Sequence, residues 1–213
     1  GRVREKESDV VKKLFENWRG YVLEQKQKYI ILIPGGFKPP HRGHVFLMNE
    51  YAKHPDVEKV IVFVGSSKRY STDGSIEINL DKSLKILDLY NITNNPKIEL
   101  RTAMQRTSSK GKEYENPFVD AVDYVQNADL ESHRNNIVAV GYPDKEEKRG
   151  RIFLNATKGA EIATSLPPIV PKADHISATR LRDAIANKDE EVIKDSLPVP
   201  SMYEEFMDII FST

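Results

Sequence analysis

Residues 29–52 place an apolar run, a turn rich in glycine and proline, and a helical pattern in direct succession. The run at residues 29–33 predicts a strand, and the apolar spacing from Val45 to Ala52 predicts a helix. An open α/β sheet binds phosphate groups at such junctions, because the ligand lies beyond the carboxyl end of the strand and at the N-terminus of the helix. We therefore expect an α/β fold with an anion-binding site at this turn.

The turn carries two histidines, His41 and His44, where the helix is expected to begin. Their spacing places both side chains on one face of the helix, one turn apart. The pattern His-x-Gly-His after a Gly-Gly-Phe turn resembles the signature of the nucleotidyltransferase superfamily, which includes the cytidylyltransferases and the adenylyltransferases of pantetheine phosphate and nicotinamide mononucleotide. Without that resemblance, the two histidines would be interpreted as helix caps or as solvated side chains. The resemblance implies nucleotide-binding roles for Gly35, Gly36, Phe37 and Gly43.

A second motif runs from Ile176 to Arg182, Ile-Ser-Ala-Thr-Arg-Leu-Arg, and leads from a loop into a predicted helix. Ser177 or Thr179 would cap this helix, and its free N–H groups, its positive dipole end and the Arg182 guanidinium suit an anion. Taken alone, the segment is better explained as an ordinary N-cap followed by a surface arginine. It is also similar to the Ile-Ser-x-Thr-x-x-Arg motif of the adenylyltransferases in the same superfamily. That resemblance implies that Ser177, Thr179 and Arg182 hold the β- and γ-phosphates of a nucleotide.

The remaining apolar patterns predict the rest of the fold. Nearly uninterrupted apolar runs are typical of parallel strands that are buried on both faces. We expect strands of this kind at residues 59–64 and 137–140, a strand of alternating pattern at residues 97–102 and a last short strand at residues 161–166. Helices are expected at residues 78–90, 117–125, 190–196 and 201–211. With the resemblance, which spans residues 29–186, these elements predict one α/β domain over residues 29–213. Its expected architecture is a Rossmann-like open parallel sheet with helices on both faces.

Three segments fall outside this pattern. Residues 8–27 carry an apolar stripe at helical spacing, so residues 1–28 are expected to form an N-terminal accessory helix. This helix would pack on the outside of the sheet domain, or it would dock a protein partner or a second copy of the chain through Trp18. The polar stretch at residues 104–116 is expected to be a disordered loop or a mobile lid, and the charged run at residues 144–151 a solvated segment.

Two further loops follow predicted strands at their carboxyl ends. Lys68 and Arg69 lie in a small, polar and basic loop, and the resemblance implies that they hold the phosphate of an acceptor substrate. The same loop is explained as well by a solvated surface turn. Gly141 and Asp144 follow the strand at residues 137–140, and the resemblance implies a place for them beside the base and ribose of the nucleotide.

The reaction implied by the resemblance is nucleotidyl transfer. A phosphate oxygen of the acceptor attacks the α-phosphorus of a nucleoside triphosphate, and pyrophosphate leaves. An attacking phosphate is already anionic, so positioning and charge stabilisation suffice for catalysis. The expected catalytic residues are His41, His44, Lys38 and Arg182. Lys38 stands where most relatives have Asp, Asn or Gln, which argues against a protein ligand to a metal there, so Mg²⁺ is expected to arrive with the triphosphate.

The donor and the acceptor are less well defined than the reaction. The form of the second motif favours adenylyl transfer, and the Arg and Gly that cytidylyltransferases usually carry just before it are absent from residues 172–175. CTP stays an alternative donor. The acceptor is open among nicotinamide mononucleotide, phosphopantetheine, and a polyol or choline phosphate.

Composition limits the other classes of function. The 213 residues carry 32 basic and 32 acidic side chains, so the charge balance argues against a nucleic-acid partner or a membrane surface. The chain has no cysteine, no apolar run of membrane-spanning length and no signal-peptide pattern, which is compatible with the cytoplasm. A class I aminoacyl-tRNA synthetase also has a His-x-Gly-His-like motif, but this chain lacks a Lys-Met-Ser-Lys-Ser-like loop. A non-catalytic nucleotide-binding or interaction protein on the same fold is the stronger alternative.

Overall fold

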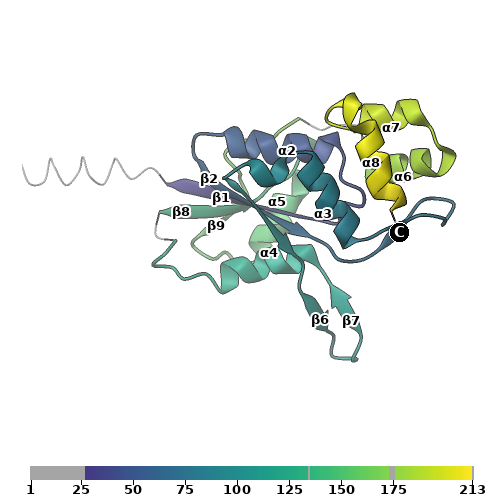
Figure 1. Ribbon diagram of the computed structural model, residues 1–213. Helices are drawn as coiled ribbons and strands as arrows, with labels where there is room; N and C mark the ends of the chain where they lie inside the picture. Colours follow the sequence, from purple (N-terminus) through teal and green to yellow (C-terminus); the bar gives the residue numbers. More distant parts are fainter. Residues whose placement is uncertain (1–26, 134, 173–175, 213) are drawn as a thin grey trace, which may run out of the picture.

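The computed structural model describes residues 27–133, 135–172 and 176–212. A five-stranded sheet in the order β5-β2-β1-β8-β9 forms the centre of the chain, and every neighbouring pair of strands in it is parallel (Figure 1). Its strands are β1 (Lys28–Gly35), β2 (Val57–Val64), β5 (Ile98–Thr102), β8 (Asn136–Val140) and β9 (Ala163–Thr164). The helices are α2 (Arg42–Lys53), α3 (Leu80–Leu89), α4 (Pro117–Gln126), α5 (Lys148–Ala156), α6 (Ala178–Asn187), α7 (Glu190–Ser196) and α8 (Tyr203–Phe211). The predicted Rossmann-like sheet is confirmed.

The order of the strands reverses beside β1. From β1 the chain proceeds to β2 and β5 on one side, and it then crosses to β8 and β9 on the other. In an open α/β sheet this switch point leaves a crevice beyond the carboxyl ends of the two strands at which the order reverses. The crevice therefore lies where β1 and β8 end, next to the start of α2.

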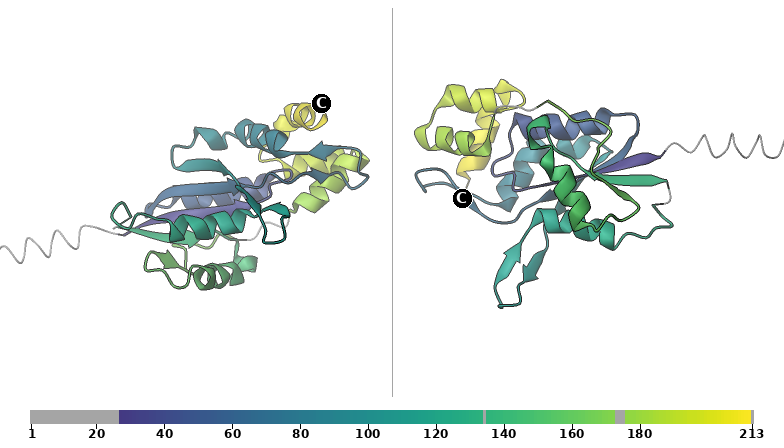
Figure 2. Two further views of the ribbon diagram at one scale, coloured as in Figure 1. Left: turned by 90° about the horizontal axis from the view of Figure 1, so that it is seen from below. Right: turned by 180° about the vertical axis from the view of Figure 1, so that it is seen from behind.

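Alternate side chains of β1 enter two hydrophobic cores, one on each face of the sheet. Ile31 and Ile33 pack under α2, α3 and the C-terminal helices, whereas Ile30 and Leu32 pack against α4 and α5. All four side chains are buried. Helices therefore cover both faces, as predicted, and both views in Figure 2 show these layers. A strand that is buried on both sides holds the turn at its end rigidly in place.

The predicted loop at residues 104–116 is wrong, because this segment is a β-hairpin. It consists of β6 (Gln105–Thr107) and β7 (Glu113–Glu115), paired antiparallel around a turn in which Gly111 has a φ of 73°. Contacts with distant residues hold the hairpin at its base. Arg106 pairs with two carboxylates of α4, and Glu115 binds the loop that follows β2. The hairpin projects from the body of the domain (Figures 1 and 2).

The charged run at residues 144–151 is mostly exposed to solvent, as predicted, and it is helical as well. It contains the short 3-10 helix η2 (Asp144–Glu146) and the first turn of α5. Phe153 of α5 is fully buried, and a Cβ on Gly150 would lie 2.2 Å from the carbonyl oxygen of Ser165, so this helix packs closely on the segment after β9. The backbone of its first turn is therefore held in place.

Four smaller elements complete the described chain. The short strands β3 (Arg69–Tyr70) and β4 (Glu77–Ile78) pair antiparallel in the loop after β2, and η1 (Ile92–Asn94) and η3 (Pro200–Met202) are single turns. The helix predicted over residues 8–27 falls almost entirely outside the described residues. No helix in the part of the chain that the structure describes is long and apolar enough to cross a membrane.

Candidate active site

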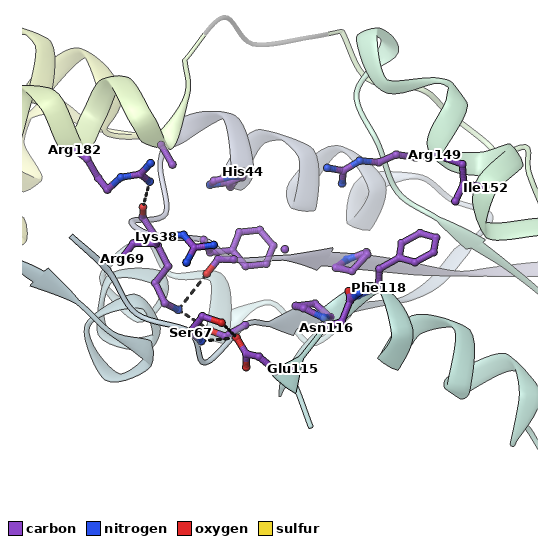
Figure 3. Close-up of a pocket in the computed structure, with 17 residues that line it drawn as sticks. Lys38, His44, Ser67, Arg69, Glu115, Asn116, Phe118, Arg149, Ile152 and Arg182 are labelled. Atoms are coloured by element: carbon purple, nitrogen blue, oxygen red, sulfur yellow. Dashed lines mark hydrogen bonds between the residues drawn. The ribbon is translucent and has the colours of Figure 1, made fainter. Parts of the chain in front are cut away.

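Two adjoining cavities open at the carboxyl edge of the sheet, at the switch point. The larger has a volume of about 610 Å³ and the smaller about 300 Å³. Both are lined by the turn at residues 34–37 and by His44, Arg149 and Ala178, so they are two parts of one cleft. The larger cavity extends toward the hairpin and α4, and the smaller toward the end of β8 and the start of α6. Figure 3 shows the larger cavity.

The turn between β1 and α2 is shaped by one close contact. Phe37 has a φ of 50°, and its ring lies so near Gly35 that a Cβ there would be 2.7 Å from the ring. Gly35 is therefore required by the packing of Phe37. The same ring meets the imidazole of His44 edge to face, with centroids 4.9 Å apart, and so it fixes the orientation of that histidine.

The two histidines cap α2, and they do so with the same nitrogen. His41 is the N-cap, and its Nδ1 accepts a hydrogen bond from the backbone N–H of Gly43 at 3.1 Å. Nδ1 of His44 accepts from the backbone N–H of His41 at 3.3 Å, and the two rings stack 3.7 Å apart. Because Nδ1 is an acceptor in each ring, the proton of the neutral imidazole must be on Nε2. The sequence-based alternative of capping histidines is correct as geometry, and it leaves Nε2 of His44 as a donor at the wall of both cavities.

His44 is uncharged at neutral pH. Burial lowers the pKa of His44 well below its usual value, and the nearby His41 and Arg149 lower it further. A neutral imidazole donates one hydrogen bond without carrying a charge of its own. The positive charge that an anion would need therefore comes from neighbouring side chains.

Lys38 is one of these cations, and only 4% of its surface is exposed. Its Nζ donates to the carbonyl oxygens of Gly65, at 2.6 Å, and Gly36, at 3.1 Å, so it joins the ends of β1 and β2. Burial lowers the pKa of Lys38 to about 8, while the carboxylate of Glu115 opposes this shift and the charge of Arg69 adds to it. At neutral pH, Lys38 is a buried cation at the wall of the larger cavity.

A direct hydrogen bond joins the two sequence motifs. Ser177 is the N-cap of α6, as predicted, and its Oγ accepts from the backbone N–H of Arg180 at 3.2 Å. One turn further, Arg182 donates to the carbonyl oxygen of Lys38 at 2.7 Å and to Oγ1 of Thr179 at 3.0 Å. The start of α6 therefore faces the start of α2 across the cleft, with Ser177 at the smaller cavity and Arg182 at the larger.

Not every predicted site residue reaches the cleft. Arg69 lines the larger cavity, whereas Lys68 pairs with Glu77 at 3.0 Å and is not among the residues that line it. Gly141 is buried behind the cleft, where a Cβ would lie within 3.0 Å of Ile31, Ile33 and Tyr51, so packing accounts for this glycine. Asp144 is exposed at the start of η2, and its neighbours Pro143 and Lys145 line the smaller cavity instead.

Several lining residues were not predicted from the sequence. Arg149 lies in the charged run, and nothing in that run distinguishes it from its neighbours before the helix and its burial pattern are known. An apolar wall of the larger cavity comes from the start of α4 and from α5: Pro117, Phe118 and Ile152. Asn116 caps α4 beside this wall, with its Oδ1 accepting from the N–H of Phe118 at 3.0 Å. From the sequence, only the start of this helix is marked, by Pro117 in its first turn.

Glu115 anchors the hairpin beside the cavity. Its carboxylate accepts hydrogen bonds from the backbone N–H and the hydroxyl of both Ser66 and Ser67, at the carboxyl end of β2. These bonds outweigh burial and lower the pKa of Glu115, so the carboxylate is charged. Because its oxygens are engaged by four donors, Glu115 is poorly placed to serve as a metal ligand. Within the described residues, no group of three or more His, Asp or Glu side chains is arranged to hold a metal ion.

The geometry was compared with solved structures. A bifunctional NMN adenylyltransferase/ADP ribose pyrophosphatase from Francisella tularensis matches 88% of this chain with a TM-score of 0.53 at 15% identity. This chain shares its α/β fold with that structure. It spans about half of the Francisella chain, 51%. A nicotinic acid mononucleotide adenylyltransferase from Plasmodium falciparum, complexed with NaAD, matches 85% of this chain and 96% of its own at 14% identity and a TM-score of 0.43.

A third match is a protein from Vibrio parahaemolyticus that is described, provisionally, as a nicotinate-nucleotide adenylyltransferase. It is 10% identical, with a TM-score of 0.44, and the match covers 87% of this chain and 97% of that one. No protein-family model and no curated protein sequence matches the chain. The likeness to the Francisella structure, at 15% identity, is a likeness of fold.

Proposed function

We propose that this protein is a nucleotidyltransferase that moves a nucleoside monophosphate, preferentially AMP, from a nucleoside triphosphate to a phosphate-bearing acceptor. The observation that carries this proposal is the hydrogen bond from Arg182 to the carbonyl oxygen of Lys38 at 2.7 Å. It joins two motifs that are far apart in the sequence across one cleft, with the Nε2 donor of His44 between them. This arrangement of donors fits a chain of phosphates.

The two cavities suggest how the substrates lie. The smaller one, next to the N-terminus of α6, suits the nucleoside. The larger one has a cationic end with Lys38, Arg69 and Arg182, and an apolar end with Phe118 and Ile152. In this arrangement the triphosphate crosses His44, the β- and γ-phosphates occupy the cationic end, and the acceptor occupies the apolar end.

The chemistry needs no strong base. An oxygen of the acceptor phosphate bonds to the α-phosphorus, the bond from that phosphorus to the bridging oxygen of the β-phosphate breaks, and its electron pair leaves with pyrophosphate. Negative charge increases on the α-phosphate and on the leaving group. The Nε2 proton of His44 stabilises the charge on the α-phosphate, and Lys38 and Arg182 stabilise the charge on the leaving pyrophosphate. His41 contributes by fixing the ring of His44 through its backbone N–H and by stacking.

Mg²⁺ fits this site as a companion of the triphosphate. The cleft offers cations and backbone donors, and both carboxylates among its lining residues are engaged: Glu115 accepts from Ser66 and Ser67, and Glu146 pairs with Arg149. Mg²⁺ keeps several waters and binds phosphates readily without a protein cage. When bound, it would neutralise charge on the leaving pyrophosphate.

Pyrophosphate release tests the proposal. Purified protein with MgATP, or with MgCTP, is offered nicotinamide mononucleotide, nicotinic acid mononucleotide, phosphopantetheine and choline phosphate in turn. We expect pyrophosphate with ATP and one acceptor, and a loss of two or more orders of magnitude in His44→Ala with an unchanged circular dichroism spectrum. Activity with CTP would reassign the donor. Nucleotide binding without pyrophosphate release from any pair would favour a non-catalytic role.

A further inference from the structure

Arg149 lies where the two cavities meet. It lines both of them, as does His44, yet it comes from α5, on the side of the cleft opposite α6. Figure 3 shows the ring of His44 between Arg182 on one side and Arg149 on the other, with Ile152 and Phe118 beyond Arg149. Arg149 is therefore on the side where the acceptor would enter. The reaction steps carried by His44, Lys38 and Arg182 do not involve it.

The guanidinium is paired with the turn just before its helix. Nε of Arg149 forms an ion pair with a carboxylate oxygen of Glu146, the last residue of η2, at 2.7 Å. The structure records no hydrogen bond from its two terminal nitrogens to another described residue. Close backbone packing at Gly150 and the buried Phe153 fix the turn of α5 that carries it. The charge of Arg149 is near enough to His44 to lower the pKa of that histidine. A guanidinium that lines a cavity with its two terminal NH₂ groups is suited to a pair of phosphate oxygens.

We propose that Arg149 is a further catalytic residue, which binds the α-phosphate from the acceptor side and holds it beside the attacking phosphate of the acceptor. This inference rests on the proposed function. During the reaction the α-phosphorus exchanges its bond to the leaving pyrophosphate for a bond to the acceptor. It must therefore lie at the junction of the two cavities, where Arg149 lies. Two phosphates that approach within bonding distance repel each other, and a cation between them removes that repulsion. Arg149 keeps its proton throughout, so it moves no atom in the reaction.

This role predicts a pattern of binding that differs from that of Arg182. ATP and AMP both have an α-phosphate, whereas only ATP has the β- and γ-phosphates that Arg182 would bind. In isothermal titration calorimetry with MgATP and with AMP, Arg149→Met should weaken both ligands by a similar factor of about tenfold or more. Arg182→Met should weaken MgATP and leave AMP within about twofold. Arg149→Lys should recover part of the affinity, because a single ammonium replaces the guanidinium.

Arg151→Met is the matched control. It removes the same charge from an exposed position of the same helix that lines neither cavity, and it should bind both nucleotides like the wild type. Circular dichroism and the melting temperature show whether each variant is folded. Wild-type affinity of Arg149→Met for both ligands, or a loss confined to MgATP, would overturn the assignment while the proposed function stands. If the wild type binds neither ligand, the proposed function fails and the assignment fails with it.

Discussion

Lys38 should make the free energy of unfolding rise with pH, and the substitution Lys38→Met should remove this dependence. The ammonium is almost fully buried, and its hydrogen bonds to the carbonyl oxygens of Gly36 and Gly65 do not replace all the water that it loses on folding. Its pKa accordingly falls from 10.5 to about 8. The folded protein therefore releases this proton at a lower pH than the unfolded chain does.

The sign and size of the effect follow from that difference. Between about pH 8 and pH 10.5 the unfolded state binds more protons than the folded state, so the free energy of unfolding rises with pH. One pKa unit corresponds to about 1.4 kcal/mol, so the buried charge costs the folded protein about 3 kcal/mol at neutral pH. About 2 kcal/mol of this should be regained between roughly pH 7.5 and pH 9.5.

Urea denaturation of the wild type and of Lys38→Met, followed by circular dichroism across this pH range, measures the effect. Their difference is informative because groups that titrate in both proteins cancel, including Tyr51 and Tyr90, whose pKa values burial raises. We expect the wild type to gain about 2 kcal/mol relative to Lys38→Met as the pH rises. Lys85→Met, which removes an exposed lysine of α3, should run parallel to the wild type. Parallel curves for Lys38→Met would refute the burial argument.

Three further predictions concern the frame around the cleft. Gly141→Ala brings a Cβ within 3.0 Å of buried side chains and should lower the free energy of unfolding in urea by about 1–3 kcal/mol, whereas Gly36→Ala, with nothing within 4 Å, should unfold like the wild type. Arg106→Met leaves the buried Asp120 carboxylate without its cation and should lower the free energy of unfolding by about 3–5 kcal/mol. Adding Asp120→Asn to the same chain should largely restore this stability, and no restoration would contradict the pairing. Glu115→Gln weakens the anchor of β6–β7 and should speed limited proteolysis of the hairpin; an unchanged rate would show that the anchor is not needed.

The junction of β1 and α2 could be predicted from the sequence because its signals are local. A run of apolar residues, a Gly-Gly turn and a helical stripe specify strand, turn and helix without help from distant residues. The same holds for Ser177 as the N-cap of α6, since capping depends on residues within one turn. Placing both motifs at one cleft required in addition only the rule that parallel strands carry their sites at their carboxyl ends.

The features that the sequence did not predict depend on tertiary contacts. The hairpin β6–β7 has strands of three residues each and a polar composition, and it is held by Arg106 and Glu115, whose partners lie elsewhere in the chain. Arg149 reaches the cleft only because α5 docks on the segment after β9. Gly141 looked like a ligand-binding glycine, but the side chain of Tyr51, on α2, accounts for it.

The central claim is that the triphosphate of a nucleotide binds across the starts of α2 and α6. Calorimetric titration of the wild type, His44→Ala and His54→Ala with MgATP tests it most directly, because His54 lies at the far end of α2 and provides a matched control. We predict one site per chain in the wild type and in His54→Ala, and an affinity lower by at least about tenfold in His44→Ala. Equal affinities in all three proteins, or no binding to the wild type, would contradict the claim.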